Sequence, residues 1–171
     1  MLVIKSIQSN IQGWMSPQEL GWLSYHAAQM QSILEIGCWK GRSTKVLLEA
    51  CPGTVTVVDN FKGDGIPGPQ RGNLEAAYNE FLINCGCYGN LISIHVMDSL
   101  GAAEVLGRYD MIFIDSCHNY KEAVADIKAW LPKAKRLICG HDYDDLWEVK
   151  RAVNENVRNF EVFGSIWSKW V

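Results

Sequence analysis

The chain lacks the features that mark membrane, secreted and nucleic-acid-binding proteins. None of its apolar runs approaches the roughly eighteen residues that a membrane-spanning helix needs. Residues 1–6 are too short and irregular for a signal peptide. Basic residues are not in excess, since the net charge is -3, and a general nucleic-acid binder would need a basic face. We therefore expect a cytoplasmic protein with a small-molecule partner, no membrane contact and no general nucleic-acid binding.

The chain also lacks a disulfide framework and a complete zinc site. Its six cysteines are scattered and nothing points to secretion, so we interpret them as free thiols. Cys85 and Cys87 could form half of a metal site, but no second cysteine or histidine pair follows at zinc-site spacing. With 171 residues, 48% of them hydrophobic, the chain can bury one sizeable core. This predicts a single domain over residues 1–171.

The chain is organised around residues 35–44, which read Glu-Ile-Gly-Cys-Trp-Lys-Gly-Arg-Ser-Thr. An apolar run precedes this stretch and a helical pattern follows it, which predicts a strand, a glycine turn and a helix. The spacing of Glu35, Gly37, Gly41 and Ser43 matches neither the phosphate loop nor the Gly-x-Gly-x-x-Gly dinucleotide turn. Trp39 occupies the place of the middle glycine that admits a pyrophosphate, so an NAD-dependent oxidoreductase is the less favoured enzyme class.

Acidic side chains follow three of the predicted strands. Asp59 ends the strand at 54–58, Asp98 follows the strand at 91–97, and Asp115 ends the strand at 109–114. Because ligands of open parallel sheets bind beyond the carboxyl ends of the strands, these acids are expected along one edge. A helix cap is the alternative role for each of them. Asp59 suits the two hydroxyls of a ribose, so the turn and this acid together describe an adenosine site.

Strands and helices alternate along the whole chain. We expect helices over 17–30, 73–84, 120–134 and 146–157, and a fifth strand over 136–139. Gly164 between strands at 160–163 and 165–170 predicts a terminal hairpin, which puts one antiparallel strand into a mostly parallel sheet. The pattern predicts an α/β, Rossmann-like three-layer domain, with an N-terminal helical segment over 1–31 that packs on the sheet and a cofactor-binding core over 32–171. The glycine-rich stretch at 62–73 is a connecting loop or a lid.

The sequence resembles the class I S-adenosylmethionine-dependent methyltransferases, and within them methyltransferase family 24. The resemblance covers nearly the whole chain and is strongest in Ile-Asp-x-x-His-x-Tyr followed by His-Asp-Tyr. The matching segments are Gly13-Trp-Met-Ser16 with Glu19, Glu35-Ile-Gly37, Gly41-Arg-Ser43-Thr44, Asp98-Ser99, Phe113-Ile-Asp115 with His118 and Tyr120, and His141-Asp142. The implied fold is a seven-stranded sheet whose last strand is antiparallel, in agreement with the predicted hairpin.

The resemblance implies a site for S-adenosylmethionine. The implied contact residues lie in the glycine turn and at the strand ends: Glu35, Gly37, Cys38, Trp39, Gly41, Ser43, Asp59, Asn60, Asp98, Ser99 and Asp115. Among them, Glu35 would hold the turn and the cofactor amine, and Asp59 the ribose. Asn60 would meet the adenine edge, and Asp98 with Ser99 the adenine amine. Carboxylates and aromatic faces suit a cationic sulfonium ligand independently of the resemblance.

Two arrangements could remove the proton of an acceptor hydroxyl. In one, Asp115, His141 and Asp142 bind Mg2+ or another divalent ion, as in metal-dependent O-methyltransferases, although His141 replaces the carboxylate that such a site prefers. In the other, His118 is the general base beside Asp115, because imidazole titrates nearest neutral pH. A purely structural role for His118 is the third alternative.

The function that these observations favour is methyl transfer from S-adenosylmethionine to a small molecule, at oxygen rather than nitrogen. The alternatives are a non-catalytic cofactor-binding or interaction protein and, further behind, the oxidoreductase. The sequence leaves the acceptor, a homo-oligomeric state and the bound ion open.

Overall fold

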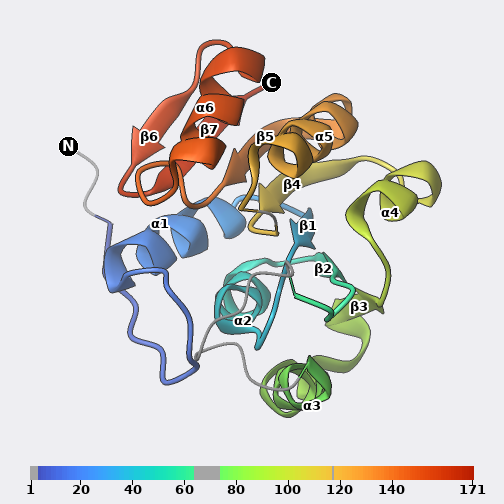
Figure 1. Cartoon of the computed structure of the whole chain (residues 1–171). Coiled ribbons are helices and arrows are strands. Elements are labelled where there is room, and N and C mark those ends of the chain that lie inside the picture. The colour runs from blue at the N-terminus through green and yellow to red at the C-terminus, as the bar shows by residue number, and fades with distance from the viewer. Residues whose placement is uncertain (1–3, 64–73, 117) are drawn as a thin grey trace.

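The computed structural model describes residues 4–63, 74–116 and 118–171, which include a seven-stranded sheet in the order β3-β2-β1-β4-β5-β7-β6 (Figure 1). The strands are β1 (Ser32–Ile36), β2 (Thr54–Val58), β3 (Ile92–His95), β4 (Tyr109–Ile114), β5 (Ala134–Gly140), β6 (Glu161–Phe163) and β7 (Ile166–Trp170). The α-helices are α1 (Pro17–Ala27), α2 (Arg42–Ala50), α3 (Leu74–Cys85), α4 (Ser99–Val105), α5 (Tyr120–Trp130) and α6 (Trp147–Asn156). The predicted loop or lid at 62–73 falls almost wholly outside the described residues.

The sheet is parallel except at one strand. β1 pairs in parallel with β2 and β4, β2 with β3, and β4 with β5, whereas β7 is antiparallel to both β5 and β6. Gly164 turns the β6–β7 hairpin with a φ of 58°, a left-handed angle that suits glycine. The predicted fold class and the single antiparallel strand are confirmed.

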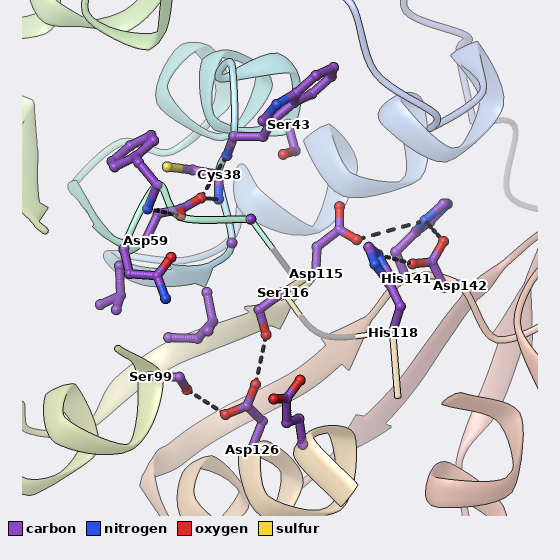
Figure 2. A pocket seen from close by; sticks show the side chains of 18 of the residues that line it. Cys38, Ser43, Asp59, Ser99, Asp115, Ser116, His118, Asp126, His141 and Asp142 are labelled. Atoms are coloured by element: carbon purple, nitrogen blue, oxygen red, sulfur yellow. Dashed lines mark hydrogen bonds and ion pairs between the residues drawn. The ribbon is translucent and has the colours of Figure 1, made fainter. Parts of the chain in front are cut away.

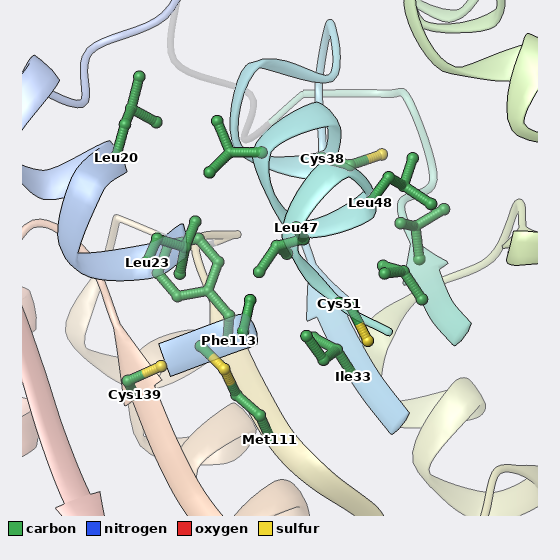
Figure 3. Packing of buried hydrophobic residues seen from close by; sticks show 14 of the residues in the cluster. Leu20, Leu23, Ile33, Cys38, Leu47, Leu48, Cys51, Met111, Phe113 and Cys139 are labelled. Atoms are coloured by element: carbon green, nitrogen blue, oxygen red, sulfur yellow. The ribbon is translucent and has the colours of Figure 1, made fainter. Parts of the chain in front are cut away.

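Helices cover both faces of the sheet. On one face, α1, α2 and α3 pack against Ile33, Val55, Phe113 and neighbouring side chains, as Figure 3 shows for part of this cluster. On the other face, α4, α5 and α6 pack against Leu34, Ile112 and their neighbours. Because the central strands are buried on both sides, their sequences are almost continuously apolar. In the described ranges, no helix is long and apolar enough to cross a membrane.

The N-terminal segment is attached to the glycine-turn side of the sheet. Ser16 and Glu19 form the predicted capping box of α1, whose residues Leu20, Leu23 and Ala27 are fully buried. Before α1, the guanidinium of Arg42 donates to the carbonyls of Ile11 and Met15, at 2.5 and 3.0 Å. These bonds hold the segment around Trp14 close to the start of α2.

Two helices are shorter than expected. α1 ends at Ala27, because the backbone N–H groups of Gln29 and Met30 bond to the carbonyls of His26 and Ala27 in a turn that leads into β1. α5 ends at Trp130 and is followed by a 3-10 turn over Leu131–Lys133, since Pro132 has no N–H to continue the α-helical ladder.

The glycine turn after β1 lies directly on the end of β4. Gly37 has a φ of 84°, and a Cβ at this position would be 2.3 Å from the carbonyl oxygen of Asp115. Both the backbone angle and the missing side chain are therefore required. This contact brings the turn and Asp115 to the same edge of the sheet.

We expect Gly37→Ala to lower the free energy of unfolding by more than about 2 kcal/mol, because it combines a left-handed φ with a backbone collision. Gly86→Ala is the matched control, since no atom lies within 4 Å of a Cβ there. Urea denaturation followed by circular dichroism measures both. Equal stability of the two variants would contradict the tight approach of Gly37 to β4.

Candidate active site

A cavity of about 730 Å³ opens at the carboxyl ends of β1, β2, β4 and β5, and residues 13–15 form part of its wall. It contains most of the predicted contact residues: Gly37, Cys38, Trp39, Ser43, Asp59, Asn60, Asp98, Ser99 and Asp115. Glu35 and Gly41 were also predicted to contact the cofactor, but they do not line the cavity. Figure 2 shows the glycine turn at one end and a cluster of acids and imidazoles at the other.

Glu35 lies behind the glycine turn and does not reach the cavity. Its side chain is fully buried, and its two carboxyl oxygens accept hydrogen bonds from Ser43 Oγ and Thr44 Oγ1, both at 2.5 Å. Burial raises its pKa to about 8, although the two hydroxyls act in the opposite direction. Glu35 therefore anchors the start of α2 behind the turn, and its position does not support a direct bond to the cofactor amine.

Gly41 also acts through the backbone. It is the N-cap of α2 with a φ of 88°, and a Cβ there would lie 2.6 Å from Cys85 Sγ. The residue therefore allows the tight start of α2 against α3. The N-terminus of α2 thereby lies next to the cavity, although Gly41 itself does not line it.

Asp59 ties the end of β2 to the glycine turn. Its Oδ2 accepts hydrogen bonds from the backbone N–H groups of Cys38 and Trp39, both at 2.9 Å, and its Oδ1 accepts one from Phe61 at 2.7 Å. These bonds hold Trp39 at a φ of 42°, an uncommon angle for a side chain of this size. Asp59 lines the cavity and shapes the turn, and its contact with a ribose stays a prediction.

Asp98 and Ser99 line the cavity but are already engaged within the protein. Asp98 caps α4 by accepting from the backbone N–H of Gly101 at 2.8 Å. Ser99 Oγ donates to Asp126 Oδ1 at 2.5 Å and accepts from Trp130 Nε1 at 2.8 Å. The helix-cap alternative thus describes Asp98, and the Ser99 hydroxyl is used to fix Asp126.

Four titratable side chains meet at the ends of β4 and β5 (Figure 2). His118 Nε2 lies 3.0 Å from Asp142 Oδ2, and His141 Nδ1 lies 2.9 Å from Asp142 Oδ1 and 3.9 Å from Asp115 Oδ1. Burial opposes ionisation of Asp142, but the two imidazoles outweigh it and lower its pKa. Desolvation raises the pKa of Asp115 to about 7. The two carboxyls thus differ in proton affinity within one site.

His141 is a buried cation that joins the site to α1. Its Nε2 lies 3.5 Å from Glu19 Oε2, a distance that allows an ion pair and is long for a hydrogen bond. Burial acts to lower the pKa of His141, but Asp142 and Glu19 raise it to about 11, so the ring is protonated at neutral pH. Hydrogen bonding to His141 and to the backbone N–H groups of Ser165 and Ser16 lowers the pKa of Glu19 to about 2, against the effect of its burial. The imidazolium is enclosed by Glu19, Asp115 and Asp142 where it lines the cavity.

The predicted metal ligands Asp115, His141 and Asp142 lie next to one another. A group in which His118 replaces His141, made of Asp115, His118 and Asp142, has ligand atoms that all lie within 4.8 Å of one another. A second group adds Asp145 to His141 and Asp142. The first group fits a divalent ion, and its imidazole suits a borderline transition metal better than Mg2+.

Comparison with protein families decides the class. Residues 34–143 match a family model described as "Methyltransferase domain", which covers more than half of the chain and contains the turn, Asp59, Asp115 and Asp142. The chain belongs to this methyltransferase family. The prediction of a class I S-adenosylmethionine-dependent methyltransferase is thereby confirmed, and the oxidoreductase alternative falls away.

Solved structures agree on the fold of this methyltransferase. Cofactor-bound Rv0187 from MTB has a TM-score of 0.70 at 18% identity, over 95% of this chain and 84% of that one. TomG, an O-methyltransferase from Streptomyces achromogenes, has a TM-score of 0.63 at 16% identity, over 91% and 79%. An O-methyltransferase from Bacillus cereus has a TM-score of 0.64 at 14% identity, over 92% and 82%. No curated protein matches the chain.

Some residues of the methyltransferase site were missed from the sequence. Asp126 lies on the buried face of α5 and accepts hydrogen bonds from Ser99 and Ser116, so it joins the ends of β3 and β4. An acid on the apolar face of a helix was the available signal. Asp145 lines the cavity from the loop before α6, and nothing in its local sequence distinguishes it from its neighbours.

The protonation of Glu35 predicts a pH-dependent stability. Between pH 5 and 8 the unfolded chain loses this proton while the folded protein keeps it, so the free energy of unfolding falls as the pH rises. We expect the decrease in the free energy of unfolding between pH 5 and 8 to be smaller by about 2–4 kcal/mol in Glu35→Gln than in wild type. Urea titrations at pH 5 and 8 measure it, with Glu161→Gln, an exposed glutamate of β6, as the control. Identical pH slopes for wild type and Glu35→Gln would contradict the assignment.

Proposed function

We propose that this methyltransferase transfers the methyl group of S-adenosylmethionine to a hydroxyl oxygen of a small molecule. The observation that carries the proposal is a single cavity with two chemically different ends. The glycine turn and Asp59 form one end, and Asp115, His118 and Asp142 form the other. A methyl donor at the first end would face an acceptor at the second.

The cofactor end suits a cationic nucleoside. The Asp59 carboxylate can share its acceptor sites with ribose hydroxyls, and Gly37 contributes only backbone atoms to the cavity wall. Trp39 and Cys38 form the adjacent wall. When bound, S-adenosylmethionine supplies an electrophilic methyl group, and the protein's main task is to align the acceptor with it.

His118 is the proposed general base. Asp142 lies 3.0 Å from its Nε2 and fixes the orientation of the ring. A neutral imidazole that donates from Nε2 to a carboxylate keeps its lone pair on Nδ1, which can take the proton of an acceptor hydroxyl. Because burial raises its pKa to about 7, Asp115 can either accept a hydrogen bond from the same hydroxyl or donate one to it. His141 balances the charge of Asp142 from behind.

The choice of oxygen rests on this base and on the O-methyltransferase activity of two of the similar structures, TomG and the Bacillus cereus enzyme. A bound divalent ion remains an alternative way to acidify the hydroxyl, with Asp115, His118 and Asp142 as its ligands. A non-catalytic cofactor-binding protein is the other alternative. Location in the cytoplasm and self-association stay predictions.

Asp59→Ala should weaken binding of S-adenosylhomocysteine by about 1.5–3 kcal/mol, roughly 10- to 150-fold, because charge-assisted hydrogen bonds are lost. Isothermal titration calorimetry measures this, and Asp144→Ala, an exposed acid outside the cavity, is the control. Because the turn also depends on Asp59, an analogue lacking one ribose hydroxyl separates the effects. Wild type should bind the analogue more weakly than it binds S-adenosylhomocysteine. Asp59→Ala should bind the two compounds equally well. Unchanged affinity in Asp59→Ala would refute the ribose assignment.

His118→Ala should lower turnover at least about 100-fold while S-adenosylhomocysteine affinity stays within about twofold, because a general base acts on the acceptor. The assay follows methyl transfer to hydroxyl compounds found in an acceptor screen. His95→Ala is the control, since His95 lies on β3 outside the cavity. Parallel loss of affinity and turnover would make His118 structural. Loss of wild-type activity in a chelator, with recovery on adding a divalent ion, would favour the metal alternative.

A further inference from the structure

The cavity is much richer in acids than in bases. Among the described residues that line it, the acids are Asp59, Asp98, Asp115, Glu122, Asp126, Asp142 and Asp145, and the bases are Arg42, His118 and His141. Asp115 and Asp126 hold their protons more tightly than usual because of burial, so they contribute less negative charge. The remaining acids still leave the described wall strongly negative.

The basic side chains are already directed at other groups. Arg42 donates to the carbonyls of the segment before α1. His141 is enclosed by Glu19 and Asp142, and His118 is paired with Asp142. Among the described residues, an anionic acceptor would therefore meet a negative wall without a dedicated cation. S-adenosylmethionine itself adds a net charge of about one positive unit, which does not reverse the sign.

The neutral part of the wall includes a tryptophan pair. The rings of Trp14 and Trp39 stack with centroids 4.7 Å apart and an angle of 32°. Trp14 is 58% exposed although it lines the cavity. Arg42 donates hydrogen bonds to the carbonyls of Ile11 and Met15, on either side of Trp14. These bonds hold the exposed indole ring of Trp14 in place. A flat aromatic ring that stacks on Trp14 would shield the exposed face of its indole from water.

We infer that the acceptor is an aromatic compound that carries a protonated amine and no carboxylate or phosphate. The ring would stack on Trp14, and the ammonium would lie towards the acids at the ends of β4 and β5, of which Asp145 is the most exposed. The inference rests on the proposed function, because it assigns the acceptor end of the same cavity. It excludes acceptors carried on phosphorylated groups, which the negative wall would repel.

The test uses probes that differ in one charge. Calorimetry first establishes whether the protein binds S-adenosylhomocysteine, and the saturated protein is then titrated with tyramine, tyrosol and para-hydroxyphenylacetate at low salt. The three share a phenol and end in an ammonium, an alcohol and a carboxylate. Tyramine should bind at least about tenfold more tightly than the carboxylate, with tyrosol between them. Cyclohexylethylamine, which lacks the aromatic ring, should bind more weakly than tyramine.

Two pairs of variants locate the recognition. Trp14→Leu should weaken tyramine about 3- to 10-fold, while Trp147→Leu, an exposed tryptophan outside the cavity, should not. Asp145→Asn should reduce the preference for tyramine over the carboxylate, while Asp144→Asn should preserve it. Affinity for S-adenosylhomocysteine in each variant shows that the fold and the cofactor end are intact.

The outcomes separate the two proposals. Without S-adenosylhomocysteine binding, the proposed function fails and this inference fails with it. If that binding is present, the inference alone is overturned by a carboxylate that binds as tightly as tyramine, by the absence of tyramine binding, or by unchanged tyramine affinity in Trp14→Leu.

Discussion

The contact between Gly37 and the end of β4 is the constraint on which the active site depends. Only a glycine allows the turn after β1 to approach the Asp115 carbonyl this closely. The parallel pairing of β1 with β4 then sets the register, with Ile36 beside Ile114. As a result, the turn and Asp115 share one edge of the sheet, and the proposed donor and acceptor ends form a continuous cavity.

Buried and half-buried polar groups hold this arrangement in place. Glu35 anchors the start of α2 through Ser43 and Thr44, and Asp59 anchors the turn through backbone N–H groups. Each such group would be costly to bury without a partner, so satisfying them all selects one geometry of the turn. Glu35 and Asp59, which the family resemblance implies as cofactor contacts, therefore also stabilise the turn and the start of α2.

A second network connects the N-terminal helix with the proposed base. Glu19 caps α1, accepts from the backbone N–H of Ser165 at 2.7 Å in the β6–β7 hairpin, and pairs with His141. His141 in turn pairs with Asp142, which orients His118. The buried imidazolium is a compact cation among three carboxyl groups, and it stabilises the ionised form of Asp142 without leaving the protein. Residues distant in sequence, Glu19 and His141, thus influence the charge of Asp142, which orients His118.

The sequence by itself determined the class of the fold, the glycine turn, the terminal hairpin and the strand-end acids, because these follow from periodicity, glycine positions and parallel-sheet geometry. It also indicated the family. Only the tertiary structure decided that Glu35 lies behind the turn, that the Ser99 hydroxyl bonds to Asp126, and that His118 and His141 both pair with Asp142 at the cavity. The physical reason is that burial, ion pairing and side-chain direction depend on contacts between distant segments, which local sequence patterns do not encode.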